Sequence, residues 1–122
     1  KEEIEKITKQ KIISNMLFII DDFENALKII EKTHKEISEG VKMIFNNFIK
    51  YLEINGVRSI NTIGEKFDPF IHEAIKKNDS DKEEDIIIEE VQKGYLFEDV
   101  VLRPSKVIIS NGKKPQGDNQ NG

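Results

Sequence analysis

The segment FDPFIHEAI, residues 67–75, contains one of the two histidines in the chain, with a glutamate directly after it. A histidine and a carboxylate are the side chains used most often for proton transfer, and both bind zinc. On a helix, however, His72 and Glu73 would point about 100° apart and could not bind one metal ion from one face. The other histidine, His34, lies in a different half of the chain, and there is no cysteine. The spacing therefore favours a structural role over a metal site.

The structural interpretation of this segment is a short helical turn. Asp68 would cap its N-terminus and Pro69 would occupy the first helical position, where its missing N–H costs nothing. His72 would then make a local hydrogen bond. Apolar side chains would pack the turn, namely Phe70, Ile71, Ala74 and Ile75.

A second candidate is the acidic stretch DSDKEED, residues 79–85, whose acids alternate at Asp79, Asp81 and Glu83. A calcium loop of this kind needs a glycine at its sixth position and a glutamate at its twelfth. The glycine is missing, and the twelfth residue, Glu90, follows three isoleucines that favour a strand. A solvated acidic turn fits better. Phosphate-binding glycine loops and nucleophile elbows are also absent from the sequence, so we expect no catalysis, cofactor, metal or small-molecule substrate.

The composition points to a small protein that completes its core against a partner. Of 122 residues, 34% are charged and 37% hydrophobic, which is a modest core for a monomer. The net charge of -4 comes from intermixed acids and bases, so nucleic acid is an unsuitable partner. No apolar run approaches the roughly 18 residues of a membrane helix. The chain opens at Lys1 already in a helical pattern, so we expect a longer segment before it.

Two amphipathic helices occupy the first half. Apolar residues recur at intervals of three and four from residue 13 to 30 and again from 37 to 52, which predicts a broad apolar stripe on each helix. The lapse around EKTHKE predicts a short connection, and Asn55 and Gly56 predict the end of the second helix. The residues expected to form the dimer interface are Ile13, Met16, Leu17, Ile20, Phe23, Leu27, Ile37, Val41, Ile44 and Phe48.

After Gly56 the pattern changes to short segments rich in Val, Ile and aromatic residues, separated by Gly and Pro. The fold class is therefore α+β: a long helix and a second helix forming a dimeric coiled coil or four-helix bundle, followed by a small all-β domain. The expected organisation is a helical dimerisation region at 1–55, a compact β domain at 56–110 and a disordered tail at 111–122. Pro104 should lie at a bend or on an edge strand.

The second half contains, in order, F-D-P at 67–69, H-x-A at 72–74, V-x-x-G-Y at 91–95 and L-R-P-S-x-V at 102–107. These ordered motifs resemble those of the GrpE family, the nucleotide exchange factors of DnaK-type chaperones. The family pattern runs F/L-D-P, H-x-A, V-x-x-G-Y and L-R-P-A/S-x-V-x-V. The helical segments MLFIIDDFENALKII and SEGVKMIFNNFIKYLEINGV are similar to the family's bundle helices, so the resemblance extends to Ser110. The matching residues of the β half are Phe67, Asp68, Pro69, His72, Ala74, Val91, Gly94, Tyr95, Leu102, Arg103, Pro104, Ser105 and Val107.

The resemblance implies a parallel homodimer that binds the nucleotide-binding domain of a DnaK-type chaperone and holds its nucleotide cleft open. It implies a bacterial cytoplasmic protein, or alternatively one of an organelle matrix. A dimeric adaptor that docks another protein through its β domain is the alternative function. The contacts that the resemblance implies on this chain are Lys28, Ile29, Phe67, Asp68, Pro69, Val91, Val100, Arg103 and Ile109.

Two positions depart from the family pattern. Val100 stands where the family commonly has a basic residue, which puts one ionic contact with the chaperone in doubt. Phe18 replaces a common proline of the first bundle helix. For Arg103 the residues leave open a direct contact or a salt bridge within the β domain, and for Gly94 and Tyr95 they favour a structural turn.

Overall fold

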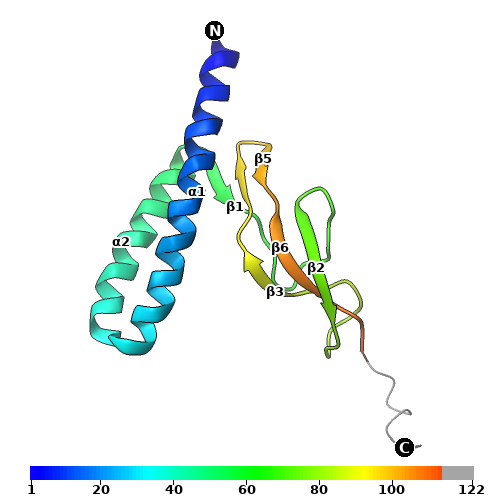
Figure 1. Ribbon diagram of the computed structural model, residues 1–122. Helices are drawn as coiled ribbons and strands as arrows, with labels where there is room; N and C mark the ends of the chain where they lie inside the picture. Colours follow the sequence, from blue (N-terminus) through cyan, green and yellow to red (C-terminus); the bar gives the residue numbers. More distant parts are fainter. Residues whose placement is uncertain (114–122) are drawn as a thin grey trace, which may run out of the picture. The chain divides into compact units, whose positions relative to one another are not determined.

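The computed structural model describes residues 1–113 and shows two helices followed by short strands (Figure 1). The predicted α+β class, with two helices before a small β region, is confirmed. The elements are α1 (Glu2–Thr33), α2 (Lys35–Ile54), β1 (Val57–Ser59), β2 (His72–Asn78), β3 (Ile87–Gln92), β4 (Tyr95–Phe97), β5 (Val100–Arg103) and β6 (Ser105–Ser110).

These elements belong to two compact units. Unit 1 comprises residues 1–58 and 96–102, and unit 2 comprises residues 59–95 and the segment from Arg103 onward. The chain therefore passes between the units three times. The expected division between residues 55 and 56 stays a prediction.

In unit 1, α1 and α2 form a helical hairpin with only His34 between them. The predicted stripes provide its core, because Leu17, Ile20 and Leu27 of α1 are at most 6% exposed. The rings of Phe23 and Phe45 stack between the helices at a centroid distance of 4.9 Å. The second helix ends where predicted.

Gly56 makes that helix end possible, because its φ of 91° is a left-handed conformation that other residues adopt at a cost. The backbone carbonyl of Gly56 accepts a hydrogen bond from the N–H of Glu98 at 2.7 Å. This bond lies beside the first small sheet, whose strand order is β1-β4-β5. Val57 and Phe97 bury their side chains there.

Unit 2 contains the second sheet, of order β2-β6-β3. The central strand β6 runs parallel to β2 and antiparallel to β3. Five of its six residues are buried, as expected for a strand covered on both faces. Ile87, Val107 and Ile109 form the core of this unit, and the ring of Phe67 packs against them.

The predicted tail at 111–122 lies mostly outside the described residues. Of its first residues, Asn111 donates a backbone hydrogen bond to the carbonyl of Asn78 at 2.9 Å. Pro104 stands outside the strands, between β5 and β6, and its predicted place at a bend or on an edge strand stays a prediction.

Candidate interaction surfaces

The segment 67–72 forms a single hydrogen-bonded turn with Asp68 at its start, as predicted, but the chain then enters β2, so the predicted continuation of the helical turn through Ala74 and Ile75 is wrong. The Asp68 carbonyl accepts hydrogen bonds from the N–H groups of Ile71 at 3.1 Å and His72 at 2.8 Å. One carboxylate oxygen of Asp68 accepts the N–H of Phe70 at 2.9 Å. An Asp-Pro pair is compatible with a turn capped by the Asp side chain as well as with the start of a helix. Here the chain continues as a strand.

His72 is a buried structural histidine, only 4% exposed. Its Nδ1 accepts the backbone N–H of Asp68 at 3.0 Å, so the ring proton lies on Nε2, which donates to the carbonyl of Asn61 at 2.9 Å. Both ring nitrogens are thus occupied by backbone groups. Glu73 is exposed and, as the next residue of a strand, points to the opposite face. The local hydrogen bond predicted for His72 is confirmed by its contact with the N–H of Asp68.

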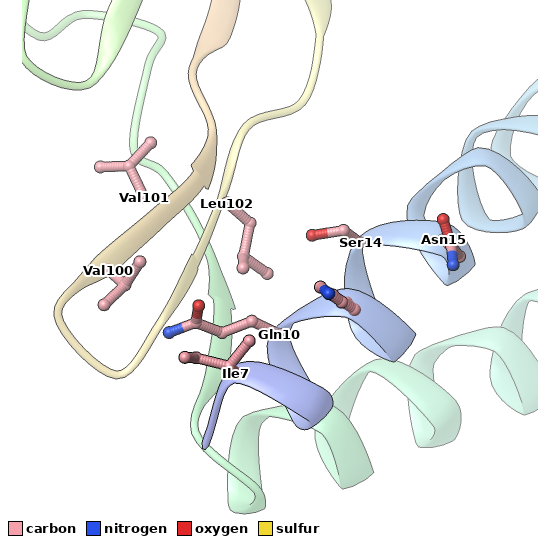
Figure 2. A pocket seen from close by; sticks show the side chains of 8 residues that line it. Ile7, Gln10, Ser14, Asn15, Val100, Val101 and Leu102 are labelled. Carbon is pink, nitrogen blue, oxygen red and sulfur yellow. The ribbon is translucent and has the colours of Figure 1, made fainter. Parts of the chain in front are cut away.

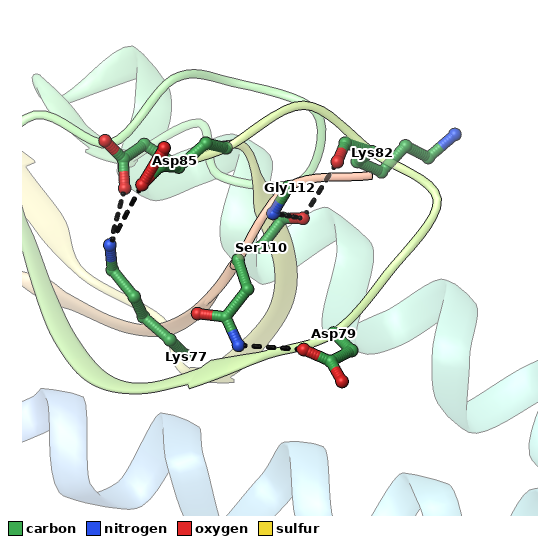
Figure 3. Close-up of polar contacts among 8 residues, drawn as sticks. Lys77, Asp79, Lys82, Asp85, Ser110 and Gly112 are labelled. Carbon is green, nitrogen blue, oxygen red and sulfur yellow. Dashed lines mark hydrogen bonds and ion pairs between the residues drawn. The ribbon is translucent and has the colours of Figure 1, made fainter. Parts of the chain in front are cut away.

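No three His, Asp or Glu side chains within residues 1–113 gather closely enough to hold a metal ion. The acidic stretch at 79–85 is instead tied to its own unit by polar contacts, as Figure 3 shows. Lys77 pairs with Asp85 at 3.2 Å, and Asn111 donates to Asp79 at 3.0 Å. The buried Ser110 hydroxyl donates to the carbonyl of Lys82 at 3.0 Å. The stretch is therefore an acidic segment held in place by hydrogen bonds and an ion pair.

The first predicted contact residues divide between the core and the surface. Phe67 is half-buried against the core of unit 2, whereas Pro69 is exposed. Phe70, predicted to pack the turn, is 85% exposed and therefore contradicts that prediction. Ile75, at 47% exposure on β2, contradicts it as well. The sequence does contain one sign that Phe70 is exposed, because the residue directly follows Asp68-Pro69, a pair typical of turns.

The predicted residues on the strands of unit 2 also differ in exposure. Val91 on β3 is 49% exposed and available to a partner. Ile109 on β6 is 3% exposed and lies in the core. Because a partner could reach Ile109 only by opening the sheet, the residue supports the surface without forming it.

Arg103 holds the turn that contains Gly94 and Tyr95. Its Nε donates to the carbonyl of Lys93 at 2.8 Å, and its guanidinium lies 5.6 Å from the centre of the Tyr95 ring. The side chain is half-buried. A structural role is thereby present, and the direct contact of Arg103 with a partner stays a prediction.

Gly94 allows this turn to lie against the start of β6. Its N–H donates to the hydroxyl of Ser105 at 2.8 Å. A Cβ on Gly94 would lie 2.3 Å from the backbone nitrogen of Ser105, far inside van der Waals contact. Only glycine therefore fits the observed approach.

Unit 1 has a groove of about 510 Å³ between α1 and β5 (Figure 2). Val100, predicted to contact a partner, lines it together with side chains of the first turns of α1. An ion pair between Lys6 and Glu98, at 3.5 Å, joins the helix to the β4–β5 turn. The lining residues are Ile7, Gln10, Lys11, Ser14, Asn15, Val100, Val101 and Leu102.

Lys28 and Ile29, also predicted to contact a partner, are exposed on α1 of the same unit, Ile29 to 64%.

A second, wholly apolar groove of about 310 Å³ runs along the helical hairpin. Ile37, Ile44 and Tyr51 follow each other at intervals of seven residues on α2, and each is at least 60% exposed. Seven-residue spacing keeps them on one side of the helix. The residues that line the groove are Met16, Ile19, Ile20, Phe23, Ile44, Phe45 and Phe48.

The ten residues predicted for the dimer interface fall into three classes in the single chain. Those already buried between α1 and α2 are Leu17, Ile20 and Leu27. Those half-buried are Ile13, Met16, Val41 and Phe48. Those left exposed are Phe23, Ile37 and Ile44.

Among the described residues, no helix is both long enough and apolar enough to cross a membrane.

The chain is similar to one family over nearly all of its length. A family model described as GrpE matches residues 1–111. The Protein GrpE of Thermotoga maritima is 42% identical over 111 residues, which cover 90% of this chain and 63% of the relative. The relative from Parageobacillus thermoglucosidasius is 38% identical over 112 residues, covering 89% and 50%. That from Lysinibacillus sphaericus is 37% identical over 113 residues, covering 89% and 57%. The chain thus spans between half and about three fifths of these relatives.

Proposed function

This chain belongs to the GrpE family, and we propose that it acts as a nucleotide exchange factor of a DnaK-type chaperone. The observation that carries the proposal is the match of the family model to residues 1–111, which includes both helices and both sheets. The similar relatives, each of them a Protein GrpE, support it. The bacterial origin of these relatives favours the bacterial cytoplasm over an organelle matrix.

The mechanism requires no bond chemistry from this chain. A protein that binds the open form of the chaperone's nucleotide-binding domain more tightly than the closed form shifts the population toward the open form. ADP then dissociates faster, because the open cleft no longer surrounds it. By linkage, the same preference makes ADP weaken the binding of the exchange factor.

The surfaces available for this contact are divided between the two units. Unit 2 contributes the exposed side chains of Pro69 in the 67–72 turn and of Val91 on β3, together with the half-buried Arg103. The half-buried Asp68 supports this surface through its hydrogen bond inside the turn. Unit 1 contributes Lys28, Ile29 and Val100. Phe67 and Ile109 support the surface of unit 2 from the core.

We also propose that the active form is a homodimer in which the helical hairpins of two copies form a four-helix bundle. The apolar groove of the hairpin supports this arrangement, since its exposed residues are large, aliphatic or aromatic and spaced as in a coiled coil. Leaving such a continuous apolar surface in water would be costly.

Release of a fluorescent ADP analogue tests the proposal. The nucleotide-binding domain of a bacterial DnaK-type chaperone is loaded with the analogue and mixed with excess ATP, with or without the full chain. We expect the chain to accelerate release in a saturable manner. A folded, dimeric chain that leaves the release rate unchanged would contradict the proposed function.

A further inference from the structure

Phe70 and Phe67 belong to the same turn and have opposite environments. The ring of Phe67 packs against the core of unit 2, whereas Phe70 is 85% exposed, more than any other large apolar side chain described. A single exposed apolar residue is common on protein surfaces. Phe70 differs from such a residue in the way the turn holds it.

The backbone around Phe70 is fixed by hydrogen bonds on both sides. The N–H of Phe70 itself donates to the Asp68 carboxylate at 2.9 Å. The carbonyl of the next residue, Ile71, accepts the N–H of Ser105 at 3.0 Å, and Ser105 is fully buried at the start of the central strand. The tip of the turn is thus anchored directly to β6.

The imidazole of His72 forms the base of the turn. It connects the backbone N–H of Asp68 to the carbonyl of Asn61 through its two nitrogens, at 3.0 and 2.9 Å. The ring is buried, so this bridge is shielded from competing water. The backbone of the turn is already ordered before a partner binds Phe70. Binding would therefore cost little conformational entropy of this turn.

We propose that Phe70 is the apolar anchor with which unit 2 binds the chaperone's nucleotide-binding domain, and that Asp68 and His72 are its positioning residues. The inference rests on the proposed function, which supplies the partner. Aromatic side chains that enter a pocket of the partner commonly carry a large share of the affinity of an interface. The Asp68 carboxylate is engaged inside the turn, so its contribution is to hold Phe70.

Binding of the full chain to the nucleotide-binding domain tests the anchor. The variants are Phe70→Ala, Phe70→Leu and, as a matched control, Ile54→Ala, whose side chain is 83% exposed on α2. We expect Phe70→Ala to weaken binding at least about tenfold, Phe70→Leu to weaken it less, and Ile54→Ala to leave it unchanged. Thermal unfolding should be the same for all, because the replaced side chains are in solvent.

The positioning role has its own readout. His72→Ala should weaken binding in the wild-type background and have no further effect in the Phe70→Ala background, since it acts through the same ring. An equal loss in both backgrounds would reject the positioning role.

The outcomes separate this inference from the proposed function. If the wild-type chain neither binds the domain nor accelerates ADP release, the proposed function fails. If the wild-type chain does both and Phe70→Ala matches it, the anchor is wrong. A loss of equal size in Ile54→Ala would also overturn the anchor, because it would show that any exposed apolar residue has this effect.

Discussion

The Nδ1 atom of His72 lies 3.0 Å from the backbone nitrogen of Asp68 and accepts its hydrogen bond. This contact explains why a histidine stands in the turn. The two nitrogens of its buried ring, one an acceptor and one a donor, satisfy a backbone N–H and a backbone carbonyl together. A residue that first suggested proton transfer or metal binding thus stabilises the entry to a strand.

His72→Ala should lower the free energy of unfolding by about 1–3 kcal/mol, because it leaves two backbone groups without a partner and removes a buried ring. Chemical denaturation followed by circular dichroism measures the change. Glu73→Ala, one residue later and exposed, is the control and should change stability by less than about 0.5 kcal/mol. Equal effects of the two substitutions would show that the hydrogen bonds of His72 contribute nothing.

Gly94→Ala should destabilise unit 2 by about 3 kcal/mol or more, because the new Cβ would lie 2.3 Å from the nitrogen of Ser105, in the backbone of the central strand. The same substitution at Gly40 is the control, since a Cβ there has no neighbour within 4 Å. Gly40→Ala should not destabilise the chain, because alanine favours a helix more than glycine does. A mild effect at Gly94 would mean that the turn can move away from β6.

The helices could be predicted because their burial follows the period of the helix itself. Leu17, Ile20 and Leu27 are buried as their spacing requires. Residue exposure in unit 2 could not be predicted in the same way. Ile109 is buried because β6 pairs with strands on both sides and is covered on both faces, and its pairing with β2 joins residues distant in the sequence.

The continuation of the turn as a helix beyond His72 was wrongly predicted for a related reason. Asp68 and Pro69 are compatible with both a helix start and a capped turn. The choice between them depends on a contact that is distant in the sequence. The N–H of Ser105 donates to the Ile71 carbonyl, and from His72 onward the chain pairs with β6 as strand β2.

Ile44→Asp should convert the proposed dimer to a monomer, because it places a charge in the apolar groove of the hairpin. The matched control is Met43→Asp. Met43 is 63% exposed and Ile44 is 65% exposed, but the two neighbours point about 100° apart on α2. Sedimentation velocity should show a monomer for Ile44→Asp and a dimer for Met43→Asp. A dimer that survives Ile44→Asp would place the interface elsewhere.

Glu31 of α1 and Lys42 of α2 form an ion pair of 2.6 Å that should make the stability of the hairpin depend on pH. The hydrogen bond and the charge of Lys42 lower the pKa of Glu31, and those of Glu31 raise the pKa of Lys42. Because the folded pKa of Glu31 is below its unfolded value, its contribution is present above the unfolded pKa and is lost as the pH falls through the folded pKa. The contribution of Lys42 is present below its unfolded pKa and is lost as the pH rises through its folded pKa.

Thermal unfolding of the wild type and of Lys42→Met across the pH range measures this contribution. The variant should be slightly less stable at neutral pH, and the difference should disappear in acid, once Glu31 is protonated in the folded state. Lys50→Met, which replaces an exposed lysine further along α2, is the control for the loss of one positive charge. The difference should also shrink in 1 M salt, because both partners are substantially exposed and the pair is screened. A difference that is constant from acid to neutral pH would show that Lys42 acts through its aliphatic chain and not through Glu31.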